Sequence, residues 1–172
     1  TISTSDNQDL KKTAEILKSS WQKLGAEVTI SIYEAGDLNQ SVIRPRRYDA
    51  LLFGEVIGRE GDLFPFWHSS ERNDPGLNIA LYVNNQADKL LESIRTESDS
   101  EKRKGLYKSF DEILKNDIPA IFIYSPNYIY VRPTKAKGVS LEKLVGPQDR
   151  FLGIRDWYIE TNAVWSIFEK TY

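Results

Sequence analysis

The chain has 172 residues, of which 40% are hydrophobic and 28% charged, and its formal net charge is −2 at neutral pH. This balance is typical of a soluble globular domain, and the small net charge does not suit a nucleic-acid-binding surface. The sequence has no cysteine, which excludes disulfides, thiol nucleophiles and cysteine metal sites. The longest apolar runs, such as Ala50–Phe53, are far too short to cross a bilayer.

A helix followed by a strand is predicted at the start of the chain. Ser5 and Gln8 have the spacing of a capping box, which marks a helix start. Apolar residues then recur three and four positions apart, which places them on one helical face: Leu10, Ala14, Leu17, Trp21 and Leu24. Gly25 suits the left-handed conformation that follows a helix, and alternating apolar positions predict a strand over Glu27–Tyr33.

The next segments lead into a long aromatic loop. Asp37 can cap a short helix that runs through Ile43 and stops before Pro45. The continuous apolar run Tyr48–Gly54 predicts a strand covered on both faces. From Glu55 to Gly76 no periodicity remains, and a loop of this length in a compact domain is usually functional. It leaves the end of a buried strand, where open α/β sheets form their ligand crevices.

Two helices and two strands are predicted in the second half. Asn84 or Asn85 can cap the first helix, and Ser98 with Glu101 repeats the capping-box spacing for the next, which ends before Pro119. Their core-facing residues share helical periodicity: Ala87, Leu90, Leu91 and Ile94 in the first, and Leu106, Phe110, Ile113 and Leu114 in the second.

The strands expected after these helices complete the fold class. Ala120–Tyr124 has the composition of a buried strand, and Tyr128–Val131 of a second short one. Beyond Pro133 we expect short loops that carry the aromatic residues Trp157, Tyr158, Trp165 and Phe168. Intermixed helices and strands predict an α/β fold with a mixed sheet and flanking helices.

The sequence offers little that is typical of an enzyme. His68 is the only histidine, and its neighbours Ser69 and Ser70 are too close in sequence to form a catalytic triad with it. Phosphate-binding and dinucleotide-binding glycine motifs do not occur, and we expect no cofactor and no metal site. Most carboxylates fall on solvated helix faces, although counting alone does not exclude a pair of the glycosidase type.

The aromatic loop holds the candidate ligand contacts. Burial of the Asp62 carboxylate would require a cation, which could be a ligand ammonium group or a lysine or arginine of the same domain. Phe64, Phe66 and Trp67 are nearly consecutive, so they cannot all pack on one face. They line a ligand cavity or form a small core of the loop itself.

Several segments resemble, in order, the carboxy-terminal lobe of the family 5 solute-binding proteins, which bind oligopeptides, dipeptides or nickel. YDALLFGE is similar to the family strand Y-D-a-x-l-x-g, and GLNIALYVNNQADKLLE to G-x-N-x-x-x-Y-x-N-x-x-x-D-x-L-L. SEKRKGLYKSFDEILKNDIPAIFIY resembles R-x-x-x-Y-x-x-x-x-x-I-L-x-x-D-x-P-x-I-x-x-Y. The resemblance runs from about Asp6 to Val139. GDLFPFWHSS departs from the family's aspartate-proline-aromatic loop, because Leu63 follows Asp62.

The resemblance implies that residues 1–172 form one lobe of a type II periplasmic-binding-protein-like clamp, as part of a longer chain. A peptide or similar small solute would bind between this lobe and an amino-terminal lobe of the same protein, outside the cytoplasmic membrane. An ABC permease would be the membrane partner, and the protein would not be an enzyme. The implied ligand-binding residues are Asp62, Phe64, Phe66, Trp67, His68 and Asn78. A ligand-sensing ectodomain that signals to a membrane partner is the alternative.

Overall fold

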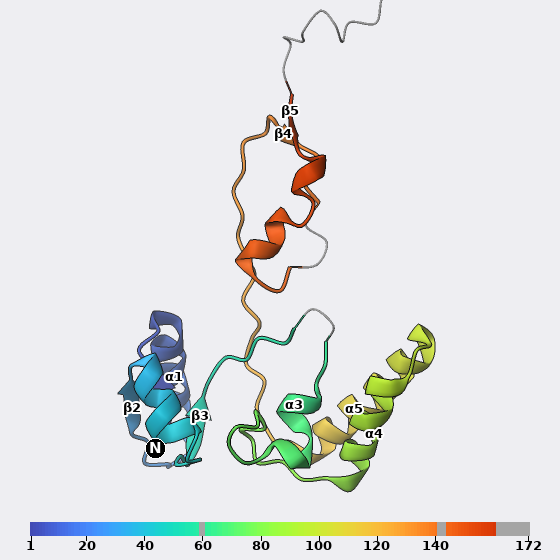
Figure 1. Ribbon diagram of the computed structural model, residues 1–172. Coiled ribbons are helices and arrows are strands. Elements are labelled where there is room, and N and C mark those ends of the chain that lie inside the picture. The colour runs from blue at the N-terminus through green and yellow to red at the C-terminus, as the bar shows by residue number, and fades with distance from the viewer. Residues whose placement is uncertain (59–60, 141–143, 161–172) are drawn as a thin grey trace, which may run out of the picture. The chain divides into compact units, whose positions relative to one another are not determined.

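The computed structural model describes residues 1–58, 61–140 and 144–160 (Figure 1). The chain divides into two compact units, one made of Thr1–Val56 and Asp62–Ile121, the other of Ile57–Gly61 and Phe122–Tyr172. Each is described by itself below. Within the described ranges, no helix has the length and apolar character that a membrane span requires.

The first unit contains a three-stranded parallel sheet. Its central strand is β1 (Ile2–Ser5), which pairs on one side with β2 (Ile30–Tyr33) and on the other with β3 (Ala50–Leu52). Sequence analysis missed β1 and began β2 three residues early. The helix α1 (Gln8–Gln22) packs on this sheet and buries its apolar stripe there. The core between them consists of Ile2, Ala14, Val28 and Leu52.

The ends of α1 differ from the prediction. Asn7, not Ser5, caps the helix, because its side-chain oxygen accepts from the backbone N–H groups of Asp9 (2.9 Å) and Leu10 (3.2 Å). Leu24 lies beyond the helix and is 84% exposed, so it is not part of the apolar face. Gly25 does adopt the left-handed conformation, with φ of 87°.

A short helical segment follows β2, as predicted, but its geometry is unusual. It consists of α2 (Ala35–Asp37) and a π-helical turn (Leu38–Ile43), and Asp37 lies inside it instead of capping it. This segment forms a small core from Leu38, Val42 and Ile43, to which Ile79 of the later loop also contributes.

The helical part of the first unit has a core of its own. It contains α3 (Phe64–Trp67), a 3₁₀ turn (Ser69–Glu71), α4 (Asn85–Thr96) and α5 (Ser100–Asp117). The helices α4 and α5 run side by side, with α3 next to α4 (Figure 1). Their shared core is Trp67, Tyr82, Ala87, Leu91, Ile94, Phe110 and Leu114. The apolar stripes predicted for α4 and α5 are therefore confirmed.

The predicted caps of these helices are confirmed only in part. Asn84 caps α4 by accepting from two backbone N–H groups. Asp99, not Ser98, caps α5 in the same way, because an aspartate oxygen reaches both of the first free amides. The helix ends at Asp117, because the next residue, Ile118, has φ of 48° and Pro119 prevents continuation.

The second unit contains an antiparallel pair, β4 (Ala136–Lys137) with β5 (Tyr158–Ile159), and 3₁₀ turns at Pro147–Phe151 and Ile154–Asp156. The strands predicted over Ala120–Tyr124 and Tyr128–Val131 are not formed, because neither segment has a strand partner among the described residues. Trp165 and Phe168 lie outside those residues. The α/β class is confirmed: the sheet of the first unit is parallel, and the antiparallel pairing lies in the second unit.

Candidate functional site

The candidate site is the aromatic loop that follows the carboxyl end of β3. It is more ordered than its sequence predicted, because α3 and the 3₁₀ turn Ser69–Glu71 lie within it. Residues 59–60 fall outside the described part. A hollow of about 220 Å³ in the same unit lies at the amino ends of β1 and β3, away from this loop, and is lined by Thr1, Ile2, Trp21, Ala26, Glu27, Val28, Asp49 and Ala50.

Asp62 has a cationic partner within the chain. Arg95 of α4 donates from Nη2 to Oδ2 at 2.7 Å and from Nε to the same oxygen at 3.1 Å. The carboxylate also accepts from the backbone N–H of Phe64 at 3.1 Å. The Arg95 hydrogen bond holds the pKa of the Asp62 carboxyl below its usual value. Of the two partners that the sequence left open, the structure contains the arginine of the same domain.

Three side chains form a stack beside this ion pair. The Arg95 guanidinium lies over the Phe64 ring, 4.0 Å from its centroid. The Phe64 and His68 rings are parallel within 14°, with centroids 4.0 Å apart. Phe64 is therefore held between a cation and an imidazole, which fixes its orientation.

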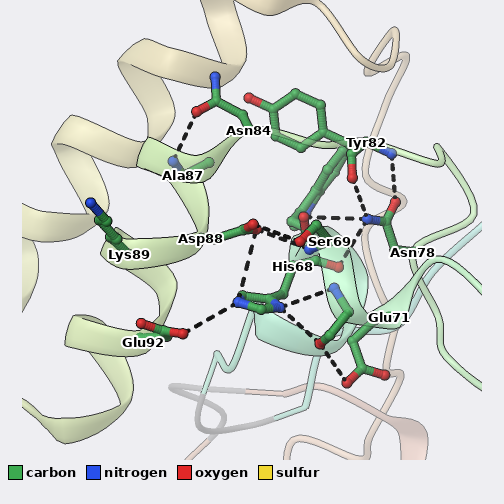
Figure 2. Close-up of polar contacts among 12 residues, drawn as sticks. His68, Ser69, Glu71, Asn78, Tyr82, Asn84, Ala87, Asp88, Lys89 and Glu92 are labelled. Atoms are coloured by element: carbon green, nitrogen blue, oxygen red, sulfur yellow. Dashed lines mark hydrogen bonds and ion pairs between the residues drawn. The ribbon is translucent and has the colours of Figure 1, made fainter.

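His68 connects the loop to α4 (Figure 2). Its Nδ1 accepts from the Ser70 backbone N–H at 3.2 Å and contacts the Ser70 hydroxyl at 2.8 Å. Because Nδ1 is an acceptor, we assign the proton of the neutral ring to Nε2. That nitrogen is buried and faces Glu92 at 3.6 Å and Asp88 at 3.9 Å, beyond hydrogen-bond distance of either carboxylate.

The Asp88 carboxylate forms hydrogen bonds with the turn that follows His68. Its two oxygens accept from the backbone N–H of Ser69 at 2.9 Å and from the Ser69 hydroxyl at 2.6 Å. Asp88, Glu92 and Arg95 lie four and three residues apart, so they form one stripe along α4 that faces the loop. A rigid helix therefore positions the loop side chains.

Asn78 organises the loop from inside and is 0% exposed. Its Nδ2 donates to the carbonyl oxygens of His68 (3.1 Å) and Tyr82 (3.0 Å), with a longer contact to that of Trp67 (3.3 Å). Its Oδ1 accepts from the Tyr82 N–H at 3.0 Å (Figure 2). The side chain is thus fully engaged within the protein.

A second polar cluster joins this loop to the end of α5. Tyr82 donates its hydroxyl to Asp117 at 2.5 Å, and Asn84 donates to the same carboxylate oxygen at 2.7 Å. These hydrogen bonds lower the pKa of Asp117, whereas burial and the nearby carboxylate raise the pKa of Tyr82. The asparagine that caps α4 therefore also ties it to α5.

The structure brings all six predicted site residues into one cluster, but they differ in exposure. The partly exposed ones are Asp62, Phe64, Phe66 and His68, whereas Trp67 and Asn78 are buried. Sequence analysis missed Asp88, Glu92 and Arg95. Their helical spacing was the only available signal, and it indicated no more than a polar helix face.

Two bacterial peptide-binding proteins are similar in sequence to most of this chain. No protein-family model matches the chain. The oligopeptide-binding protein AppA of Bacillus subtilis is 26% identical over 161 residues, which are 92% of this chain and 29% of AppA. The di/tripeptide-binding protein 3 of Pseudomonas aeruginosa is 32% identical over 117 residues, 66% of this chain and 21% of that protein.

Solved structures show the same fold. AppA, solved in complex with a nonapeptide, matches with a TM-score of 0.72 and 24% identity, over 93% of this chain and 31% of the AppA chain. NikZ of Campylobacter jejuni, in complex with Ni(L-His), matches with a TM-score of 0.65 and 24% identity, over 91% of this chain and 32% of its own. The chain therefore spans less than a third of the length of these relatives.

These relatives are peptide-binding proteins. A further structure with the same fold is DppA of Helicobacter pylori, an ABC transporter-associated periplasmic binding protein solved in complex with a peptide. These proteins do not favour the sensor alternative, because they are peptide- and nickel-binding components. The order of the motifs in the sequence and the matching fold both support a relation to these binding proteins. The chain is a relative of the family 5 extracellular solute-binding proteins and corresponds to part of their length.

Proposed function

We propose that this chain forms part of the solute-binding component of an ABC importer. The complete gene product would hold a peptide or similar small solute outside the cytoplasmic membrane and present it to a membrane permease. The similarity to AppA carries the proposal, since it extends over 92% of the chain in sequence and 93% in fold. In this role the protein binds and releases its ligand without catalysis.

Residues 1–172 would act as the carboxy-terminal lobe, with an amino-terminal lobe of the same protein as their partner. Ligand would then close the two lobes around a hinge, which is a common response of binding proteins. The ordered match of motifs between Asp6 and Val139 supports this assignment. Among the described residues, no cluster of three or more histidine, aspartate or glutamate side chains could hold a metal ion.

The ligand contacts would come from the exposed side of the aromatic loop. Phe66 would offer ring surface, which suits a site that must accept varied side chains, whereas Phe64 and His68, which stack on one another, would offer only the parts of their rings that stay exposed. Asp62 would exchange its partner Arg95 for the ammonium group of the ligand, since both side chains of this ion pair are partly exposed. The buried Trp67 and Asn78 would support the loop without touching the solute.

Calorimetry on the complete gene product tests this proposal with di-, tri- and oligopeptides. We expect binding of at least one class, and we expect Phe66→Ala to weaken it about tenfold, which corresponds to roughly 1.4 kcal/mol. Ile16→Ala is the control, because Ile16 lies on α1 of the same unit, outside the loop, and is 66% exposed. Melting temperatures of both variants exclude unfolding as the cause. Equal affinities for the two variants, or no peptide binding at all, would overturn the proposal.

A further inference from the structure

A short segment between the π-helical turn and β3 holds the far end of the aromatic loop. Arg46 lies in this segment, and its guanidinium bridges carbonyl groups from two parts of the first unit. It donates from Nε to the Arg72 oxygen at 2.9 Å and from Nη2 to the Gly76 oxygen at 2.6 Å. It also donates from Nη1 to the Ile43 oxygen at 2.8 Å. One side chain therefore ties residues 72–76 to the end of the π-helical turn.

The backbone of Arg46 is unusual as well. Its φ is 55°, in the left-handed region that residues with a side chain rarely adopt. Such a conformation costs free energy and persists only where the surrounding contacts hold it. The three hydrogen bonds of the guanidinium are contacts of this kind. A lysine cannot replace them, because it has a single nitrogen where arginine has a planar fork of donors.

Two neighbouring side chains also bind this loop, but their contacts are less well placed to control it. Arg44 forms a bidentate ion pair with Asp74, with both N–O distances 2.9 Å, and the two side chains are 48% and 39% exposed. Exposed pairs of this kind add little to stability. Tyr48 donates to the Ile79 oxygen, which lies past the turn. Arg46 is partly buried and binds the turn itself.

Gly76 connects the Arg46 contacts to the candidate site. It lies so close to the backbone at Glu71 that a Cβ on Gly76 would clash with the Glu71 oxygen. That oxygen also accepts from the Asn78 N–H at 3.0 Å. The Asn78 side chain in turn binds the carbonyl groups of His68 and Tyr82. A shift of Gly76 therefore moves Asn78 and, with it, the backbone that carries the His68 ring.

We propose that Arg46 is a positioning residue for the aromatic loop: by holding Gly76, it keeps Asn78 and His68 in the geometry that the solute meets. The consequence for solute binding rests on the proposed function, whereas the consequence for the loop geometry does not. Loss of the guanidinium should loosen the loop without unfolding the unit, because Arg46 belongs to none of its three apolar cores.

Hydrogen exchange on the complete gene product without ligand tests the effect on the loop. Arg46→Gly removes the side chain while glycine accepts the left-handed backbone, and Arg46→Lys is a milder change that keeps the charge. In both variants the Asn78 and Tyr82 amides should exchange at least about tenfold faster than in the wild type. Arg47→Gly is the matched control and should leave these rates unchanged, since the Arg47 side chain is exposed and has no hydrogen bond or ion pair among the described residues.

Calorimetry with peptides, at temperatures where melting curves show every variant folded, separates positioning from stability. Both Arg46 variants should bind about tenfold more weakly than the wild type, and Arg47→Gly should bind equally well. A residue that only stabilised the fold would lower the Tm and leave the affinity of the folded protein unchanged. Wild-type exchange rates or wild-type affinity in both Arg46 variants would overturn the proposal. If the wild type binds no peptide, the proposed function fails, and the exchange rates alone decide whether Arg46 positions the loop.

Discussion

The partner exchange at Asp62 can be tested by removing its charge. Asp62→Asn keeps an oxygen that can accept from the Phe64 N–H, but it loses the attraction to Arg95 and to a ligand ammonium. A charge-assisted hydrogen bond to the ligand contributes about 2 kcal/mol. Binding must first break the Asp62–Arg95 pair, whose side chains are 39% and 45% exposed, and such a pair contributes about 0–1 kcal/mol.

The net loss expected for Asp62→Asn is therefore about 1 kcal/mol, or roughly fivefold in affinity for a peptide with a free amine. Arg95→Gln should have the opposite effect and strengthen binding by a similar factor, because it frees the carboxylate. Calorimetry on the complete protein with a peptide and its N-acetylated form measures both effects.

The decisive result is non-additivity. Acetylation should weaken binding to the wild type and have little further effect on Asp62→Asn. If the two losses simply add, or if Arg95→Gln binds no better than the wild type, Asp62 is part of the scaffold and our reasoning is refuted.

Three further predictions concern stability and are checked by thermal or denaturant unfolding of the complete protein. Asn78→Ala should destabilise it by about 2–3 kcal/mol, because buried carbonyl and N–H groups lose their hydrogen-bond partners. Asn73→Ala, at an exposed position, is the control and should change the stability by less than about 0.5 kcal/mol. Equal effects of the two variants would contradict the role of Asn78 in holding the loop together. Gly76→Ala should destabilise, because a Cβ there would clash with the backbone oxygen of Glu71. Gly105→Ala, in open space on α5, should instead stabilise by about 0.5–1 kcal/mol, and a neutral Gly76→Ala would show that the close approach to Glu71 is wrong. The folded-state pKa of Asp62 lies below its unfolded value, so the stability from its ion pair is present above about pH 4 and is lost as the pH falls through the folded pKa. Acidification should therefore lower the Tm more in the wild type than in Asp62→Asn, and parallel curves would contradict this.

The sequence predicted the three long helices well, because their apolar residues repeat with helical periodicity. Their caps were less predictable, because Asn7 lies two residues after Ser5 and Asp99 directly follows Ser98, and only the backbone geometry selects which side chain caps the helix. The strand β1 was missed because Ile2–Ser5 is short and mostly polar, and because its two partners come from distant parts of the chain.

The sequence predicted which loop to consider as the candidate site, but it did not predict the contacts within that loop. Clustered aromatic residues after a buried strand indicated the loop, and all six expected residues do lie together. The sequence contains no signal that Arg95 reaches Asp62, because this pairing depends on how α4 packs against the loop. The burial of Asn78 likewise arises from tertiary structure, since asparagine is usually exposed.

The central claim, that the complete protein carries a small solute, is tested most directly by mass spectrometry of what it releases. The gene product is purified without added ligand, denatured and filtered, and the filtrate is analysed for small molecules. We predict peptides, recovered from the wild type in greater amounts than from Phe66→Ala. A filtrate without peptides or any other solute, from a protein that is folded and stays empty in calorimetry with peptides, would contradict the account.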